Sequence, residues 1–270
     1  MCLALTLTAG ARGWAQDESP APATTPQNEV AVSKTGAEGV MCLEPPPMVR
    51  WQDYNGPMAK IVGTLGAKLD RPAVNLPNYK AGQILCSLGV KDKFLLFVHD
   101  TVNPVTVLTV AFNSGLDQAE NSEARFGQGM EGYGKRFGAN EASNTTGRFL
   151  SEFLFPTLLR EDPRYYRLGE GTIKHRFLHA AAHTFVAHRD SGSLMPNVSL
   201  WMGTTGGVLM SDVYHPGTTH GPGPISLQVG INIGEDTGFD ILREFWPEIA
   251  RGLHVPFRSE SNPIPRPIGR

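Results

Sequence analysis

The sequence lacks an excess of charge of either sign, since 24 Lys and Arg residues stand against 26 Asp and Glu residues. A chain so close to neutral has no general basic field to hold nucleic acid or an anionic membrane, so we expect no nucleic-acid partner. Charged residues make up 19% of the 270 residues and hydrophobic ones 40%. That balance is enough to bury a core in one domain or two small ones.

Cysteine is also scarce, with three residues in the chain. Cys2 lies in the apolar opening segment, which leaves Cys42 and Cys86 as a pair. In an oxidising compartment the simplest use of such a pair is one disulfide, whereas in a reducing one both remain free thiols. The spacing alone does not decide between these two states.

No long, purely apolar run is present. The stretch 191–210 carries no charge, but Pro196, Asn197 and Ser199 dilute its apolar content. We therefore predict no membrane-spanning helix, although a peripheral membrane contact stays open. Recurrent alternating segments, which a membrane barrel requires, are missing as well.

Familiar catalytic motifs are also missing. The chain has no Gly-x-Ser-x-Gly elbow, no phosphate-binding loop ending in Gly-Lys-Ser or Gly-Lys-Thr, and no His-Glu-x-x-His. The sequence therefore assigns no catalytic residue.

The N-terminal part predicts export. Residues 1–16 form a short apolar run ending in Gly-Trp-Ala-Gln, typical of a signal peptide, although the basic residues that usually lead it are absent. Either the start lies upstream or the segment does not direct export. Residues 17–47 are rich in Pro, Ala and Thr and predict a disordered linker. We expect a helical domain over 48–250, a proline-rich basic tail over 251–270, and a location in the periplasm or outer envelope.

Helical periodicity dominates the domain, so the predicted fold is mainly α: a compact multi-helix domain. Asn103 and Pro104 form a strong N-terminal helix signal, with Gly115 near the expected stop, and Pro156 should kink an apolar helix. The other expected helices cover 58–69, 91–100, 173–188, 196–214 and 224–245.

Small residues recur at four-residue spacing and predict close helix contacts. The three stripes are Gly134, Gly138 and Ala142; Gly203, Gly207 and Ser211; and Gly230, Gly234 and Gly238. For the first stripe a glycine-rich loop is an equal alternative. Around the third, 225–234 also alternates apolar and small residues as a strand does, but no second such run offers a partner, which favours a helix.

The segment "KHRFLHAAAH" places His175, His179 and His183 four residues apart, on one face of the expected helix. Imidazoles at this spacing can share a metal, and Asp190, His215 or His220 could complete a zinc site. The same histidines can instead bond backbone or carboxylate groups. If the histidines bond backbone or carboxylate groups, no cofactor is expected. If they form a metal site, the cofactor is zinc.

The string "REDPRYYRLGEG" interleaves arginines, acids and tyrosines. Arg164, Tyr165 and Arg167 could recognise an anionic glycan or a lipid headgroup, because guanidinium groups and phenols suit phosphate and sugar oxygens. The alternative is a structural corner, in which Asp162 caps a turn before Pro163 and the arginines pair with acids.

Six motifs support a resemblance. They are "DKF" (92–94), "GYGKRFGA" (132–139), "EDPRYYR" (161–167), "DSG" (190–192), "YHP" (214–216) and "EFWPEI" (244–249). Through them the chain, over about residues 91–250, resembles a group of uncharacterised exported bacterial proteins. The resemblance implies export and a shared fold, and it carries over no activity.

The sequence thus predicts an exported envelope protein that acts as a structural or binding module toward an unidentified envelope component or protein partner. One alternative is a metal-dependent hydrolase built on His175, His179 and His183. Another is a binder of anionic glycans or lipid headgroups through Arg164, Tyr165 and Arg167.

Overall fold

A computed structural model describes residues 41–45, 56, 58–75, 84–215, 221–255 and 264–267. The chain divides into two units, Met1–Glu38 and Gly39–Arg270, and all described residues belong to the second. The predicted signal peptide over 1–16 and the linker residues 17–40 lie outside the described residues.

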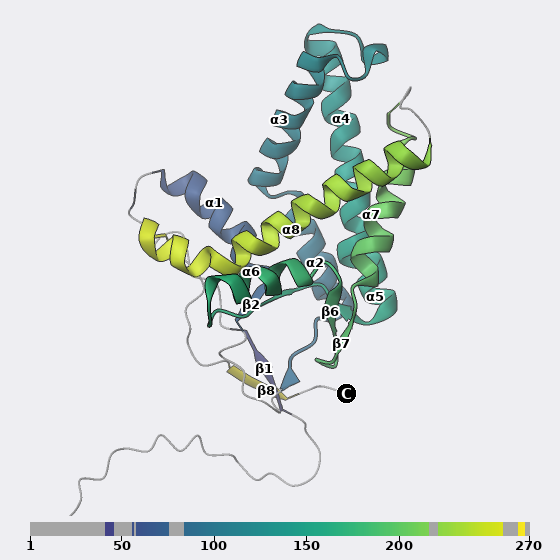
Figure 1. The fold of residues 1–270 in the computed structure, drawn as a ribbon. Coiled ribbons are helices and arrows are strands. Elements are labelled where there is room, and N and C mark those ends of the chain that lie inside the picture. The colour runs from purple at the N-terminus through teal and green to yellow at the C-terminus, as the bar shows by residue number, and fades with distance from the viewer. Residues whose placement is uncertain are drawn as a thin grey trace, which may run out of the picture. The chain divides into compact units, whose positions relative to one another are not determined.

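The second unit is mainly helical, which confirms the predicted fold class (Figure 1). Its longest elements are α3, α4, α7 and α8, and the chain turns back on itself between α3 and α4. The helices are α1 (Ala59–Asp70), α2 (Val90–Thr101), α3 (Pro104–Glu120), α4 (Gly129–Arg148), α5 (Phe155–Leu159), α6 (Ile173–Ala182), α7 (Val198–Ser211) and α8 (Pro222–Leu253), with a 3-10 turn η3 (Ala124–Phe126) and a π-helix η4 (Phe149–Leu154).

Short strands form small sheets beside the helices. Strand β1 (Met41–Glu44) lies between β3 (Ile84–Leu85) and β8 (Ile264–Pro267); β2 (Ala73–Asn75) pairs with β5 (Tyr165–Arg167); and β6 (Val186–Arg189) lies between β4 (Glu161–Asp162) and β7 (Leu194–Pro196). The linker predicted up to residue 47 is thus corrected at β1, and the tail predicted from 251 is corrected at β8. Both segments are strands because they pair with other parts of the chain. Local composition does not reveal these partners, since they are remote in sequence.

Helix α3 begins where the sequence predicts, but it ends later than predicted. Asn103 caps the helix by accepting a hydrogen bond from the Val105 amide at 2.9 Å, with Pro104 in the first turn. The helix then continues through Gly115 to Glu120, where Asn121 adopts a left-handed φ of 52°. An interior glycine costs a helix about 1 kcal/mol relative to alanine, which weakens the helix without ending it.

Helix α8 also extends beyond its predicted end at residue 245. It includes 225–234, which confirms the helical alternative there, and it runs through Pro247 to Leu253. Proline removes one backbone donor, but Trp246 and Ala250 on either side of it are buried in a cluster with Leu69 of α1 and Val255. This apolar packing offsets the lost hydrogen bond.

The histidine helix is shorter than predicted. Helix α6 ends at Ala182, His183 is its C-cap, and 186–189 form strand β6 rather than a further helical turn. The strand pairs with β7 across the Asp190–Gly192 turn, where Gly192 has a φ of 84°. The prediction of one helix to residue 188 is therefore wrong, because cross-strand pairing on both sides of β6 outweighs its helical periodicity.

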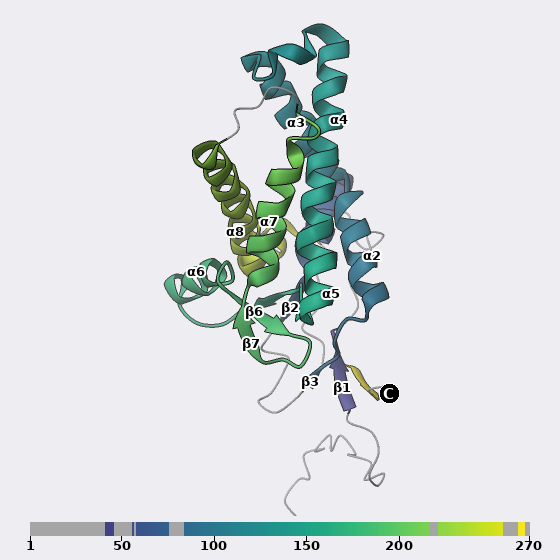
Figure 2. The same ribbon diagram turned by 90° about the vertical axis from the view of Figure 1, so that its right-hand side faces the viewer.

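One of the three predicted glycine stripes forms a close contact, between α7 and the α4–η4 rod, which Figure 2 shows running together. A Cβ on Gly203 would lie 2.5 Å from the Ser151 Cα, and one on Gly207 would lie 2.7 Å from the Gly147 Cα. Gly147 and Ser151 are themselves four residues apart, so two small-residue edges meet. The irregular winding expected near Pro156 lies just before it, in η4.

The other two stripes do not pack as predicted. A Cβ added at Gly134 or Gly138 of α4, or at Gly230, Gly234 or Gly238 of α8, would meet no atom within 4 Å. The residues of both stripes do lie in helices, so the loop alternative for 125–140 is wrong from Gly129 onward, where α4 begins. Spacing identifies a thin helix edge, and only the tertiary fold decides whether a neighbour occupies it.

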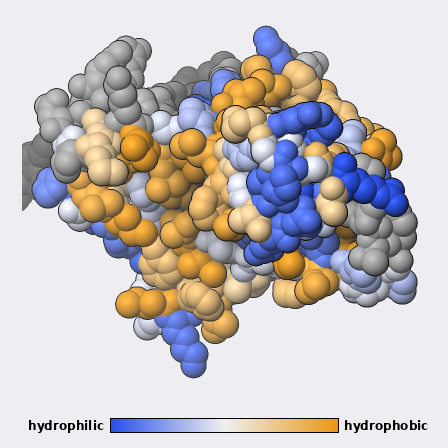
Figure 3. All heavy atoms as spheres, turned by 90° about the horizontal axis from the view of Figure 1, so that it is seen from above, coloured by the Kyte–Doolittle hydropathy of each residue, from blue (hydrophilic) through white to orange (hydrophobic). Residues whose placement is uncertain are grey.

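Apolar side chains are exposed along several helices, and they take up much of the face seen in Figure 3. Within the described residues, no single helix has both the length and the apolar composition to cross a bilayer. Helices α2 and α3, which meet at a bend of 47°, reach those limits only when taken together.

Candidate functional site

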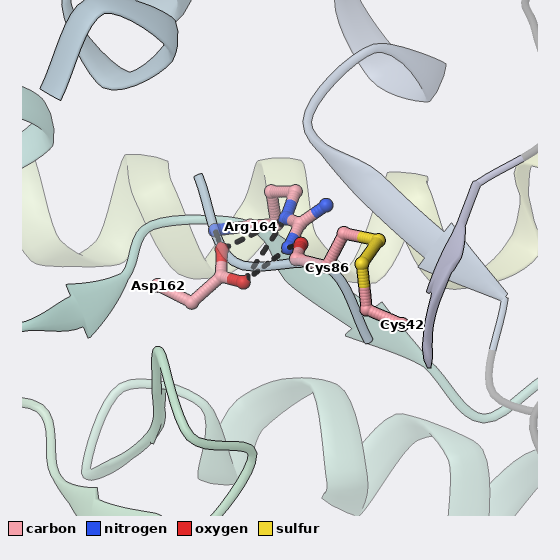
Figure 4. Close-up of a disulfide and its surroundings, with 4 residues drawn as sticks. All are labelled: Cys42, Cys86, Asp162 and Arg164. Atoms are coloured by element: carbon pink, nitrogen blue, oxygen red, sulfur yellow. Dashed lines mark hydrogen bonds and ion pairs between the residues drawn. A yellow bond between two sulfur atoms is a disulfide. The ribbon is translucent and has the colours of Figure 1, made fainter. Parts of the chain in front are cut away.

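The "EDPRYYR" corner is anchored to the disulfide. Cys42 and Cys86 are joined, with their Cα atoms 4.8 Å apart, which confirms the paired state. Arg164 donates from NH2 to the Cys86 carbonyl at 2.9 Å and from Nε to Asp162 Oδ1 at 2.9 Å (Figure 4). Arg164 is 5% exposed and Asp162 2% exposed. This guanidinium therefore holds the corner against β3 and its neighbour β1.

Glu244 of α8 organises the other side of the corner. Its carboxylate accepts hydrogen bonds from the Tyr165 hydroxyl at 2.8 Å, from the Leu168 and Gly169 amides at 2.9 Å, and from Arg176 Nε at 2.9 Å. Burial by itself raises the pKa of Glu244, but these donors outweigh burial and the pKa is lowered overall. The residue is therefore an ionised carboxylate inside the protein, satisfied by its neighbours.

Arg167 completes the corner. It is 1% exposed and donates to Asn75 Oδ1 at 2.6 Å and to the Arg243 carbonyl at 2.5 Å. Arg164, Tyr165 and Arg167, predicted as ligand-binding residues, are thus buried and bonded to groups of the chain itself. This arrangement matches the structural-corner interpretation of the motif.

The histidines of the predicted metal face have separate partners. His175 is exposed, His179 Nε2 lies 2.8 Å from the Tyr166 carbonyl, and His183 Nδ1 lies 2.6 Å from Asp240 Oδ2. His183 keeps helical backbone angles as the C-cap of α6, but its ring bonds a carboxylate of α8, so the three histidines do not share a ligand.

The other proposed ligands lie apart from that face. Asp190 Oδ2 accepts from Lys93 Nζ at 2.9 Å, and His215 contacts Glu123. In the described part of the chain, no three His, Cys, Asp or Glu side chains are arranged to hold a metal ion. His220, a further candidate, lies outside the described residues.

What the structure does bring together is a cluster of rings, here called the histidine–tyrosine cluster: Tyr165, Tyr166, His179, His183 and His188. His188 stacks on Tyr166 with ring centroids 3.8 Å apart, and Tyr165 meets His183 edge-on at 5.3 Å. Burial, followed by the charge of His183, lowers the pKa of His188 to about 4. The His188 ring is therefore neutral at physiological pH.

A second group of polar residues, here called the charge cluster, comprises Lys68, Asp100, Arg148, Glu152, Asp236 and Arg243. These side chains influence one another electrostatically, and Arg148 forms an ion pair with Glu152 one turn away. Burial is the main reason that the pKa of Glu152 is raised to about 7 and that of Lys68 is lowered to about 8. The opposite charges of Arg148 and Arg243 limit the rise at Glu152.

Sequence reasoning missed the charge cluster. Its one local signal is the spacing of Arg148 and Glu152, which places both on one helix face. The convergence of α1, α2, the α4–η4 rod and α8 cannot be obtained from that spacing.

Comparison with known proteins returned no matching family model, no matching curated protein and no matching solved structure. The site is therefore interpreted from its own geometry.

Proposed function

We propose that the chain is an exported protein of the cell envelope that works by association with an envelope component, as a structural or binding module, rather than by catalysis. The observation that carries the proposal is the distribution of polarity in the second unit. Large apolar side chains are exposed on several helices, whereas many ionised groups are buried.

Large apolar side chains are exposed on α3, α7 and α8. Phe112 of α3 is 66% exposed, Leu227 of α8 67% and Met202 of α7 50%. Single exposed apolar residues are ordinary, but several on adjacent turns mark a surface that binds a protein or a membrane.

Several ionised side chains form ion pairs within the protein. Lys93 is bonded to Asp190, Arg176 to Glu244 and Glu248, and Arg164 to Asp162. These pairs connect α2 to the turn after β6, and α6 to α8. Internal ion pairs that hold the helices in place, together with apolar side chains that face outward, suit a module that binds a partner through its surface.

The disulfide supports the choice of compartment. Disulfides persist in the periplasm and outside the cell and are rare where thiols are kept reduced. Cys42 and Cys86 are far apart in sequence, and the bond between them closes the small sheet on which the corner rests.

The test is to trap thiols in intact producing cells and to fractionate them. We expect the chain in the envelope fraction, its N-terminus beginning after about residue 16, and Cys42 and Cys86 protected from a thiol-reactive mass tag until reductant is added. A Cys86→Ser variant, in which Cys42 reacts without reductant, is the control. Full-length chain with reactive cysteines, found in the cytoplasm, would refute the proposal.

A further inference from the structure

Helices α2 and α3 both expose large apolar side chains, which are here called together the α2–α3 face. Its members are Phe94, Leu95, Val102, Leu108, Phe112 and Leu116, exposed by 41–66%. Leu108, Phe112 and Leu116 follow one another at four-residue spacing, so they form a single stripe along α3. No described element covers this stripe.

Between Phe94 and Leu116 no acidic, lysine or arginine side chain is exposed, whereas Lys91, Asp92 and Glu120, at the outer ends of α2 and α3, are exposed. Asp100 is the one acidic residue between Phe94 and Leu116, and it is 2% exposed and points into the charge cluster. Lys93, just before the segment, is likewise 2% exposed and bonded to Asp190. His99 and Asn113 are the polar side chains of the segment that are exposed and have no hydrogen bond to another described residue.

The hydroxyl groups of α3 donate hydrogen bonds to backbone carbonyls, so they do not depend on water for a partner. Thr109 is exposed, yet its Oγ1 donates to the Val105 carbonyl at 2.8 Å. Ser114 Oγ donates to the Val110 carbonyl at 2.7 Å, and Thr106 Oγ1 to the Asp100 carbonyl at 2.8 Å. In hydrocarbon an unpaired hydroxyl is costly, and these internal bonds remove that cost.

The inner side of α3 is its polar side. Lys68 Nζ donates to Thr106 Oγ1 at 2.8 Å, and Asn140 Nδ2 donates to Ser114 Oγ at 3.0 Å and to Asp117 Oδ2 at 2.8 Å. A helix packed on a water-soluble core has its apolar stripe inside and its polar stripe outside. Helix α3 has the reverse arrangement, which suits an apolar environment.

We propose that the α2–α3 face docks into the acyl-chain region of a phospholipid bilayer. This names the partner surface of the association proposed above and rests on it. An uncharged face with internally bonded hydroxyls complements uncharged hydrocarbon, and the pair also has the length and composition of a broken span. Because α3 is about 26 Å long by the helical rise and is bent against α2, shallow docking in one leaflet fits better than a straight crossing of about 30 Å.

The first experiment is flotation of the full-length protein with vesicles of phosphatidylcholine and phosphatidylglycerol. A Leu108→Gln, Phe112→Gln double variant should lower the vesicle-bound to free ratio by more than about tenfold, because both apolar side chains are lost from the face that enters the hydrocarbon. The matched control is Ile173→Gln, Leu178→Gln on α6, where both side chains are also exposed, and its binding should be unchanged. Circular dichroism and thermal melts verify that both variants fold.

The second experiment locates the face in the bilayer. Phe112→Trp should add fluorescence that lipids brominated on the acyl chains quench, whereas Ile173→Trp should add fluorescence that they do not quench. Equal flotation of the double variant and the wild type, or no added quenching at position 112, would overturn the proposal. So would a lipid-free dimer that the double variant dissociates, since a second copy would then occupy the face. Fractionation tests the envelope location independently, so these outcomes would overturn bilayer docking without deciding where the protein is located.

Discussion

Tyr165 of β5 donates its hydroxyl to Glu244 of α8 at 2.8 Å, with the tyrosine 1% exposed and the carboxylate fully buried. The two residues come from the "EDPRYYR" and "EFWPEI" segments, so this bond ties two of the most unusual stretches of the sequence together. Burial and the nearby Glu244 charge raise the pKa of Tyr165, so the phenol remains a donor. The bond therefore ties β5 to α8 inside the protein.

Replacing Glu244 should destabilise the fold strongly. In Glu244→Gln the charge is lost, and Arg176 Nε together with the Leu168 and Gly169 amides faces a neutral amide that cannot satisfy all of them. We expect a loss of about 2–4 kcal/mol in the free energy of unfolding, measured by denaturant titration.

The matched control for that change is Glu248→Gln. Glu248 bonds the same arginine, with Oε1 2.6 Å from Arg176 NH1, but its side chain is 42% exposed. Its loss should cost less than about 1 kcal/mol, because solvent screens the pair. Equal costs at 244 and 248 would show that burial of the Glu244 carboxylate is not what makes it important.

The glycines of α7 and α8 should respond oppositely to alanine. In Gly207→Ala the new methyl group would lie 2.7 Å from the Gly147 Cα, so α7 and α4 must separate, at a cost of about 1–3 kcal/mol. In Gly234→Ala the methyl group meets nothing within 4 Å, and the better helix propensity should stabilise by about 0.5–1 kcal/mol. Thermal melts of both variants in the same buffer make the comparison, and a stabilised Gly207→Ala protein would contradict the packing.

Loss of the disulfide should be costly. A Cys42→Ser, Cys86→Ser variant should lose about 4 kcal/mol in the free energy of unfolding, the value that chain entropy predicts for a closed loop of 44 residues. Guanidinium titration of the oxidised wild type and the variant measures it. Reduced wild type is the control and should match the variant; a reduced protein as stable as the oxidised one would contradict the prediction.

Local sequence signals predicted the features that depend on neighbours in the chain. Asn103 and Pro104 begin α3 because a side-chain cap and a fixed φ act within one turn. The Asp190–Gly192 turn is also local, since glycine supplies the positive φ. The mainly helical fold follows from the sum of such signals.

Features that depend on remote partners could not be predicted. His183 was placed on a helical face with His179, but the sequence did not show that its ring would bond Asp240, 57 residues away. Glu244 gave no signal of its own, because its donors come from β5, the following loop and α6. The sequence thus singled out the histidines and the "EDPRYYR" residues, whereas the tertiary fold determined what each of them contacts.

His188 connects the histidine–tyrosine cluster to stability. Its ring lies on Tyr166, and one ring nitrogen, Nδ1, is buried without a hydrogen-bond partner in the described residues. Burial and the nearby His183 charge disfavour the imidazolium, which lowers the pKa to about 4 from an ordinary value of about 6.5. The unfolded chain therefore takes up the proton at a higher pH than the folded one does.

Stability should consequently fall as the pH is lowered from about 6.5 to about 4, because the unfolded state binds more protons in that window. Relative to His188→Phe, which keeps a ring over Tyr166 but cannot titrate, the wild type should lose on the order of 1–2 kcal/mol across the window, since the ring is only partly buried. Urea titrations at a series of pH values measure the difference. A Val186→Ala variant on the same strand should differ from the wild type by an amount independent of pH. If the difference between the wild type and His188→Phe were also constant, protonation of His188 would not be coupled to folding.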